Sequence, residues 1–309
     1  IDPIFFENSF ENVDFEETGF LIISKSGSTP ETLSQFSSLY QIAMQKNQLD
    51  IFLSNVLIIT EFKESPLYKI AKEKKCSILE HHNNIGGRYS VFSNVGIVPA
   101  IISGVNIEKL YKGVANIIEN IEINGSLDLC KYLFCISEKK YNSNVVMTYS
   151  DSLFFFGKWY LQLWAESIGK NNKGITAIHS IGTTDQHSQL QLYLDGPLDK
   201  FFTFITTDHR NKGLKINDDI FHNTSIDYLT NKTMGDLMSA EQQATIETFK
   251  VKNFSFREIF IPKLDEENIG KLLALSMIET ISSCIYLNVN PFDQPAVEMG
   301  KKLTKQYLR

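Results

Sequence analysis

Short apolar segments alternate with longer amphipathic ones along most of this chain, and the apolar ones are apolar at consecutive positions, as in Val56-Leu-Ile-Ile-Thr60. A strand that is apolar on both faces is typical of a parallel sheet covered by helices on both sides. We therefore predict an α/β fold with mainly parallel sheets. The predicted strands are residues 19–24, 56–60, 77–80, 144–149, 175–179, 201–206 and 254–261. The predicted helices are residues 30–46, 65–74, 152–168, 234–250 and 266–286, a last helix after Pro295, and helical stretches between 94 and 139.

The strand–helix alternation starts again near residue 140, which predicts two such units in tandem. The length of 309 residues agrees, because a single core usually stops growing at about 250–300 residues. We place the two domains at residues 1–139 and 140–309. Ligands in such sheets bind beyond the carboxyl ends of the strands.

Composition argues against several classes of partner. The net charge of −6 offers no basic footprint for nucleic acid or an anionic membrane. No apolar run approaches 18 residues, which argues against a transmembrane span. The cysteines form no CxxC pair, which favours reduced thiols in a cytosolic protein. These cysteines are Cys76, Cys130, Cys135 and Cys284. No set of residues with metal-ligand spacing appears, so we predict no metal.

Residues 24–32, Ser-Lys-Ser-Gly-Ser-Thr-Pro-Glu-Thr, follow the first predicted strand directly. Ser28 and Glu31 have the spacing of a capping box, and Pro30 suits a first helical turn. The unpaired N–H groups of a helix N-terminus, with nearby hydroxyls, would form a phosphate cradle. These hydroxyls belong to Ser24, Ser26 and Thr29. A plain helix cap is the alternative.

The segment Gly86-Gly-Arg-Tyr-Ser90 places one permanent cation beside two glycines. Glycine lets the backbone approach a ligand closely, and arginine presents a planar fork of donors to an anion. Arg88 is therefore a candidate for holding an oxyanion. A solvated arginine in a turn is the alternative.

Three further groups of polar residues are candidates for catalysis. Lys158, Gln162 and Glu166 share one helix face, and a carboxylate such as Glu166 near a helix C-terminus suits a general base. His187 follows a glycine turn, although a packed or capping histidine is the commoner case. Gln294 and Lys301 lie two helical turns apart on one face, although a surface lysine is the simpler interpretation. We interpret the adjacent pair His81 and His82 as loop residues.

In this order, the segments resemble the glucose-6-phosphate isomerase family, from about residue 15 to residue 308. The resemblance covers the phosphate loop at 24–32, the arginine signature at 86–96, Trp-Ala-Glu-Ser-Ile-Gly-Lys at 164–170, the histidine segment at 182–189 and Phe-Asp-Gln-Pro-Ala-Val-Glu-Met-Gly-Lys at 292–301. The amino-acid sequence of the histidine segment is similar to that of the family's shorter bacterial branch. The resemblance implies two tandem three-layer αβα subdomains of SIS type, followed by a C-terminal helix.

The resemblance also implies a role for each candidate. Glu166 would move the substrate's C2 proton to C1 through a cis-enediolate, and Arg88 would stabilise the negative charge of that intermediate. His187, helped by Lys301, would open the sugar ring. The residues implied in substrate binding are Ser24, Lys25, Ser26, Thr29, Gln162 and Gln294. No cofactor is implied, since the proton returns to the same carbon skeleton.

Several wider expectations follow from the resemblance. The chain would interconvert D-glucose 6-phosphate and D-fructose 6-phosphate in glycolysis and gluconeogenesis, in the cytoplasm, as a homodimer in which His187 completes the partner's site. The family's upstream Gly-Gly-Ser turn is not found before Ser24, so we expect the first subdomain to be truncated at its N-terminus. Pro295 stands where many relatives have tryptophan. Two alternatives are an isomerase of another hexose phosphate, such as mannose 6-phosphate, and a non-catalytic sugar-phosphate-binding SIS protein.

Overall fold

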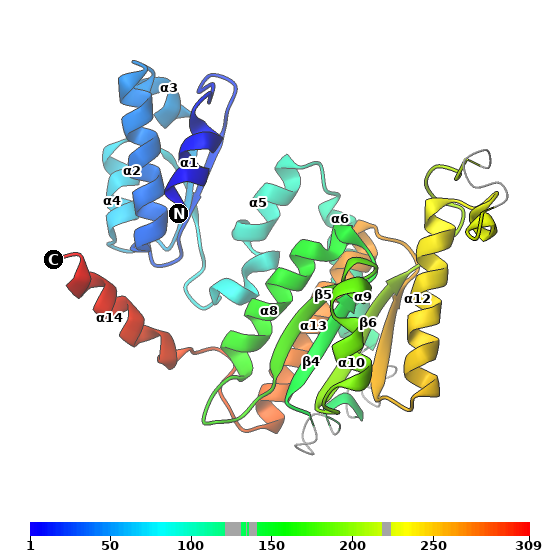
Figure 1. The fold of residues 1–309 in the computed structure, drawn as a ribbon. Helices are drawn as coiled ribbons and strands as arrows, with labels where there is room; N and C mark the ends of the chain where they lie inside the picture. The colour runs from blue at the N-terminus through cyan, green and yellow to red at the C-terminus, as the bar shows by residue number, and fades with distance from the viewer. Residues whose placement is uncertain (121–130, 134, 136–140, 218–223) are drawn as a thin grey trace. The chain divides into compact units, whose positions relative to one another are not determined.

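The computed structural model describes the whole chain except residues 121–130, 134, 136–140 and 218–223 (Figure 1). By contacts, the chain forms two compact units, Ile1–Val105 and Asn106–Arg309. Both are α/β units with parallel sheets, so the predicted fold class is confirmed. The predicted domain boundary at residues 139/140 lies later in the chain than the division between these units, and it stays a prediction.

The first unit contains a three-stranded sheet in the order β1-β2-β3, with every strand parallel to its neighbour. The strands are β1 (Phe20–Ile23), β2 (Val56–Thr60) and β3 (Ser77–Glu80). The helices are α1 (Pro3–Phe10), α2 (Pro30–Gln45), α3 (Leu49–Ser54), α4 (Pro66–Glu73) and α5 (Asn94–Ile102), with the 3₁₀ turn η1 (Gly87–Phe92). An aromatic cluster fills the core, where the rings of Phe15, Phe20 and Phe52 contact one another. Helices α1 and α3, which are only eight and six residues long, were not predicted from the sequence.

The second unit contains a four-stranded parallel sheet in the order β5-β4-β6-β7 (Figure 1). The strands are β4 (Ser143–Thr148), β5 (Thr176–Ile181), β6 (Lys200–Thr207) and β7 (Phe256–Ile261). The helices are α6 (Ile107–Asn120), α8 (Phe154–Ile168), α9 (Thr184–Ser188), α10 (Leu190–Asp195), α12 (Met234–Val251), α13 (Glu266–Tyr286) and α14 (Glu298–Tyr307). The unit also contains the 3₁₀ turns η3 (Asp151–Leu153), η4 (Asp227–Leu229) and η5 (Pro295–Val297).

Each face of the second sheet packs against helices. Side chains of α8 and α13, including Trp164 and Cys284, form one core with Val146 of β4. Phe249 of α12 and Tyr193 of α10 pack on the other face, against Phe202 of β6. This three-layer arrangement agrees with the αβα architecture that the resemblance implies.

Helix α6 belongs to the second unit because it packs closely against α13. A Cβ atom at Gly113 of α6 would lie 1.9 Å from the Glu267 carbonyl oxygen, and one at Gly270 of α13 would lie 2.1 Å from the Leu110 carbonyl oxygen. Both distances are far below any real contact, so only glycine permits the two backbones to approach this closely.

Helix α13 is long and apolar enough, by length and composition alone, to cross a membrane. Within the second unit, 44% of the helix's most apolar 18-residue stretch is buried, and the helix carries the buried carboxylate Glu279. Arg257 of β7 donates two hydrogen bonds to that carboxylate, so α13 carries one member of a charged pair. A core helix of a folded domain passes the same length test, and the expected lack of a membrane partner stays a prediction.

The cysteines and acidic residues form no special centre within the described ranges. Cys76 and Cys135 are free thiols there, Cys284 is buried, and Cys130 lies outside the described residues. Burial raises the pKa of the Cys76 thiol, which makes that side chain less reactive. Among the described residues, no group of three or more His, Cys, Asp or Glu side chains is placed to hold a metal ion.

Candidate active site

The predicted phosphate loop joins β1 to α2. Ser24 and Thr29 lie together, with 2.8 Å between their hydroxyl oxygens. Helix α2 begins at Pro30, as predicted, and its N-cap residue Thr29 makes no side-chain capping hydrogen bond. This leaves the helix N-terminus and clustered hydroxyls at the carboxyl end of a parallel strand, which is the arrangement that binds phosphate in α/β proteins.

The predicted capping box is wrong. The N-cap is Thr29 rather than Ser28, so Ser28 and Glu31 are out of position for the reciprocal bonds that define the motif. The Ser28 hydroxyl instead donates to the hydroxyl oxygen of Ser26 at 3.1 Å, within the loop.

Gly27 fixes the shape of the loop. Its φ of +64° is in the left-handed region, and a Cβ atom there would lie 2.1 Å from the Ser65 hydroxyl oxygen. The Gly27 carbonyl oxygen accepts a hydrogen bond from the Leu67 N–H at 2.9 Å. The loop is therefore pressed against the start of α4, with no room for a side chain.

We expect Gly27→Ala to weaken substrate binding and to destabilise the first unit by about 1–3 kcal/mol, since it adds both a strained φ and a clash with Ser65. The measurements are KM and thermal unfolding. Gly104→Ala is the matched control, because Gly104 also has a left-handed φ (+78°) but a Cβ there meets nothing within 4 Å. Equal effects of the two variants on KM would contradict the packing argument.

Arg88 lies in η1 and is almost fully buried, with 2% of its surface exposed. Its guanidinium carbon lies 5.3 Å from the centre of the Tyr89 ring. The turn around it is held by the Ser90 hydroxyl, which donates to the Gly87 carbonyl oxygen at 2.6 Å. Burying a charged guanidinium costs a large desolvation free energy, which a solvated arginine does not incur. The interpretation as a solvated arginine in a turn is therefore wrong for Arg88.

The Lys25 side chain turns toward the loop that precedes Arg88. Its ammonium donates to the Asn83 carbonyl oxygen at 2.8 Å and lies 3.7 Å from a carboxylate oxygen of Glu61. Sequence reasoning did not find Glu61, although an acidic residue directly after a buried strand is a recognisable signal of a polar group at the site edge.

In the second unit, α8 brings together two of the predicted residues. The Gln162 side-chain amide donates to the Glu166 carboxylate at 3.0 Å, as expected for i, i+4 neighbours. Lys158 lies one turn earlier, where its ammonium is 5.4 Å from the centre of the Phe154 ring. Helix α8 ends at Ile168 with Gly169 as its C-cap, so Glu166 lies in the last turn, as predicted.

Helix α8 is held firmly against β5. A Cβ atom at Gly157 would lie 2.3 Å from the His179 ring, so the helix packs directly on that imidazole. The Trp164 indole N–H donates to the Ile175 carbonyl oxygen at 2.9 Å. Burial lowers the pKa of His179, and the nearby Lys158 ammonium lowers it further, so the ring packs as a neutral group.

Lys170, which we did not assign from the sequence, caps the end of α8. Its ammonium donates to the carbonyl oxygens of Glu166 (3.0 Å) and Ser167 (2.6 Å) and lies 3.4 Å from the Asp293 carboxylate. The side chain is only 9% exposed. A basic residue just after a helix end is a known capping signal and could have been found.

We expect Lys170→Met to lower kcat about tenfold, because the last turn of α8 would lose its cap and Glu166 would be held less precisely. The free energy of unfolding should fall by about 1.5–3 kcal/mol, the usual contribution of a hydrogen bond to a charged group. Lys173→Met is the control, since the Lys173 ammonium also donates to a helix-end carbonyl oxygen, that of Leu287 at the C-cap of α13. A fall in kcat of the same size in both variants would remove Lys170 from this role.

His187 is exposed on the short helix α9, whose neighbouring residues anchor it. The Asp185 carboxylate accepts a hydrogen bond from the Ile181 N–H at 2.7 Å. The Tyr149 hydroxyl, whose pKa is raised by burial, donates to the Gln186 side chain at 2.8 Å. The fold thus fixes the residues before His187 and leaves its imidazole in solvent, which does not fit a packed histidine.

Gln294 and Lys301 are exposed near the end of the chain. Gln294 directly precedes η5, and Pro295 occupies the first position of that turn, which proline tolerates. The Lys301 ammonium forms an ion pair with Glu298 at 2.7 Å, one turn away on α14. Such a surface pair is weak, so it leaves the ammonium available for another anion.

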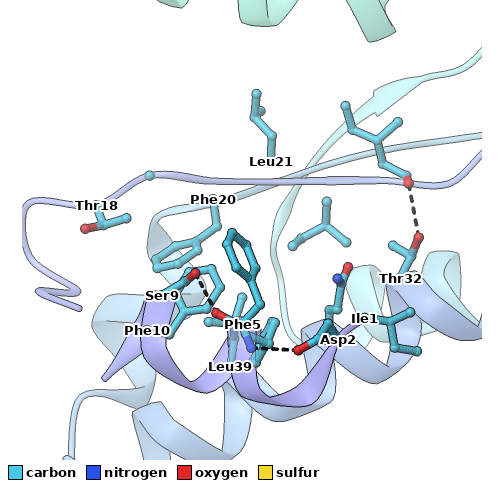
Figure 2. Close-up of a pocket in the computed structure, with 15 residues that line it drawn as sticks. Ile1, Asp2, Phe5, Ser9, Phe10, Thr18, Phe20, Leu21, Thr32 and Leu39 are labelled. Carbon is cyan, nitrogen blue, oxygen red and sulfur yellow. Dashed lines mark hydrogen bonds between the residues drawn. The ribbon is translucent and has the colours of Figure 1, made fainter. Parts of the chain in front are cut away.

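Described residues of the first unit line a groove and a smaller cavity. A groove of about 600 Å³ runs along β1 and is bounded by α1 and α2 (Figure 2). Phe5, Phe10 and Leu39 make it largely apolar, and Figure 2 shows Phe5 and Phe10 on the α1 side of the strand. None of the predicted site residues lines it. The other cavity, about 430 Å³ in volume, is lined by Glu61, Phe62, Lys63, Glu80, His81 and Asn83.

Comparisons with known proteins agree on one family. A family model described as phosphoglucose isomerase matches residues 1–309. The chain is 36% identical to a probable glucose-6-phosphate isomerase of Methanococcus maripaludis, over 99% of this chain and 69% of the relative. It is 34% identical to a glucose-6-phosphate isomerase of Campylobacter jejuni, over 98% of this chain and 75% of the relative.

Solved structures agree in fold. A hypothetical protein of Thermus thermophilus superposes with a TM-score of 0.91 at 28% identity, over all of this chain and 75% of the other. A glucose-6-phosphate isomerase of Chlamydia trachomatis superposes with a TM-score of 0.79 at 22% identity, over 99% of this chain and 62% of the other. At 22% identity, the similarity to the second structure shows the fold alone.

Proposed function

The chain belongs to the phosphoglucose isomerase family, and on that basis we propose that it interconverts D-glucose 6-phosphate and D-fructose 6-phosphate. Relatives named glucose-6-phosphate isomerase cover nearly all of the chain, which supports this aldose–ketose isomerisation. The proposal places the reaction in glycolysis and gluconeogenesis, with a hexose 6-phosphate as the substrate.

The proposed chemistry moves one proton between two carbons. After ring opening by His187 and Lys301, the Glu166 carboxylate removes the C2 proton of the open aldose. The electrons of that C–H bond form a C1=C2 double bond, and the aldehyde oxygen O1 takes the negative charge of the enediolate. Glu166 then returns the proton to C1, while the hydroxyl proton of O2 passes to O1 and leaves a ketone at C2. A general base of this kind contributes about 10²–10⁴ in rate.

Arg88 and the phosphate loop provide the charges in this proposal. Arg88 stabilises the enediolate oxygen, and a preorganised cation of this kind is worth about 10²–10³ in rate. The 6-phosphate is held at the N-terminus of α2 by the loop hydroxyls, and Gln162 and Gln294 position sugar hydroxyls. The loop residues are Ser24, Lys25, Ser26 and Thr29.

The observation that best supports the proposal is the pairing on the last turns of α8. A general base needs a fixed carboxylate, and Gln162 donates to Glu166 while Lys170 caps the same turn. A module that only bound sugar phosphate would need the loop of the first unit but not this fixed carboxylate.

The proposal is tested by a coupled assay in which glucose 6-phosphate formed from fructose 6-phosphate is oxidised with reduction of NADP⁺. Turnover by the purified chain supports the proposal, and a chain that binds fructose 6-phosphate without turnover would favour the non-catalytic alternative. Mannose 6-phosphate is tested as a second substrate with an auxiliary glucose-6-phosphate isomerase, which converts the fructose 6-phosphate formed into the ester that the assay detects. Faster turnover of the mannose ester would change the assigned substrate.

We further propose that the active species is a homodimer in which His187 serves the partner's active site. We expect a mixture of Glu166→Gln and His187→Ala chains, unfolded and refolded together, to recover about a quarter of wild-type activity. Random pairing makes about half of the dimers mixed, and each mixed dimer has one intact site. Each variant refolded alone is the control, and recovery no greater than the sum of those controls would contradict the shared site.

The remaining expectations are also proposals. We propose a cytoplasmic location, which fits the free thiols among the described cysteines. We propose neither nucleic acid nor membrane as a partner, and the net charge of −6 supports that choice.

A further inference from the structure

The three strands of the first unit end at one edge of the sheet, and the segments that leave them are bonded to one another there. Glu61 follows β2, and Lys25 lies two residues beyond the end of β1. The Glu61 N–H donates to the Lys25 carbonyl oxygen at 3.2 Å. The His81 N–H after β3 donates to the carbonyl oxygen of Thr60 at 2.8 Å. The cavity of about 430 Å³ described above opens at this edge, with Glu61 and His81 in its wall.

Two lysines form ion pairs with the buried carboxylate of Glu61. Its side chain is 8% exposed, and both Lys25, at 3.7 Å, and Lys63 form ion pairs with it. A buried carboxylate must be compensated to stay charged, so these lysines are constrained by it. The two lysines differ in exposure, because the Lys63 side chain is 56% exposed and the Lys25 side chain is 32% exposed.

The Lys25 side chain therefore joins two loops. Lys25 itself belongs to the phosphate loop, between Ser24 and Ser26. Its ammonium donates to the carbonyl oxygen of Asn83, which lies five residues before Arg88. One side chain thus links the phosphate loop to the segment that carries the arginine, over a separation of 58 residues in the sequence.

We propose that Glu61 is a positioning residue for the isomerase reaction, acting through Lys25. By holding the Lys25 ammonium on the Asn83 carbonyl oxygen, Glu61 fixes the phosphate loop relative to the arginine loop. This rests on the proposed function for the identity of the substrate. A lysine side chain loses much rotamer freedom when it is ordered, and the buried carboxylate opposes that cost. Glu61 itself need not touch the substrate.

The test compares two variants that each remove one ion pair from the same carboxylate. Glu61→Gln releases Lys25, whereas Lys63→Met removes the exposed partner and leaves Lys25 in place. We expect Glu61→Gln to raise KM for fructose 6-phosphate about tenfold and to lower kcat severalfold, since small misplacements of binding groups are costly. Lys63→Met should change both constants by less than about twofold.

A merely structural role for Glu61 gives a different result. Loss of folded protein would lower the apparent kcat and leave KM unchanged, and that outcome would overturn the proposal. Equal changes in both variants would overturn it too, because the effect would then be one of local charge. A fall in KM for Glu61→Gln would mean that Lys25 binds phosphate better when released, which also contradicts it.

Hydrogen exchange provides a readout that needs no catalysis. Peptides covering residues 80–88 should exchange faster in Glu61→Gln than in wild type, and should be unchanged in Lys63→Met. Unaltered exchange in Glu61→Gln would overturn the link between the loops. If the wild-type chain shows no isomerase activity, the proposed function fails while this comparison still decides whether Glu61 holds the two loops together.

Discussion

Replacing Glu166 by glutamine should lower kcat about 10³-fold while leaving substrate binding largely intact, because the base is lost but the shape is kept. The side chain keeps an oxygen that can accept the hydrogen bond now donated by Gln162, so the end of α8 need not rearrange. The measurement is the coupled assay together with the affinity for substrate by calorimetry.

A second readout isolates the proton transfer itself. In deuterated water the wild type should exchange the C2 hydrogen of glucose 6-phosphate with solvent, and Glu166→Gln should not. Glu247→Gln is the matched control, since Glu247 is an exposed helical carboxylate paired only weakly with Lys250, and it should behave as wild type. A Glu166→Gln variant that kept most of the wild-type rate would sink the assignment of the base.

Replacing Arg88 by methionine should lower kcat about 10²–10³-fold with a smaller effect on binding, since its charge is needed mainly when the enediolate forms. Methionine is unbranched and adapts to an irregular space, so it keeps much of the volume of a side chain that is 2% exposed. Steady-state kinetics give kcat and KM separately, and circular dichroism with a thermal scan checks that the variant is folded.

Arg88→Lys separates charge from geometry. Lysine keeps the charge but loses the planar fork, so we expect partial activity between that of Arg88→Met and wild type. An unchanged kcat in the methionine variant would remove Arg88 from the enediolate role. Identical losses in both variants would point instead to the fork as the essential feature.

The strands and long helices could be predicted because their signals are local. The apolar run of β2 gave its bounds correctly at both ends, as did the amphipathic pattern of α13. The short helices α1 and α9 were missed, since eight and five residues contain too few periods for a pattern to stand out. At α2 the capping residue was placed one position early, because serine and threonine are both good caps and only the backbone decides between them.

The residues of the candidate site could be predicted from the sequence, but most of the contacts that position them could not. Gln162 and Glu166 are four residues apart, so their contact follows from helical periodicity. The bond between Lys25 and Asn83 joins residues that only the pairing of three strands brings together, and no sequence pattern indicates it. The burial of Arg88 was likewise hidden, since the same glycine-rich turn could have left the side chain in solvent.

The close packing of α6 on α13 has a practical consequence for work with pieces of this chain. A fragment that starts at Asn106 keeps Gly113 beside Glu267 and Gly270 beside Leu110, whereas a fragment that starts at residue 140 removes α6 and uncovers the backbone of α13. The part of α13 that now packs against α6 would then be open to contacts with other chains during expression. We therefore expect a fragment that starts at residue 140 to aggregate more readily than one that starts at Asn106.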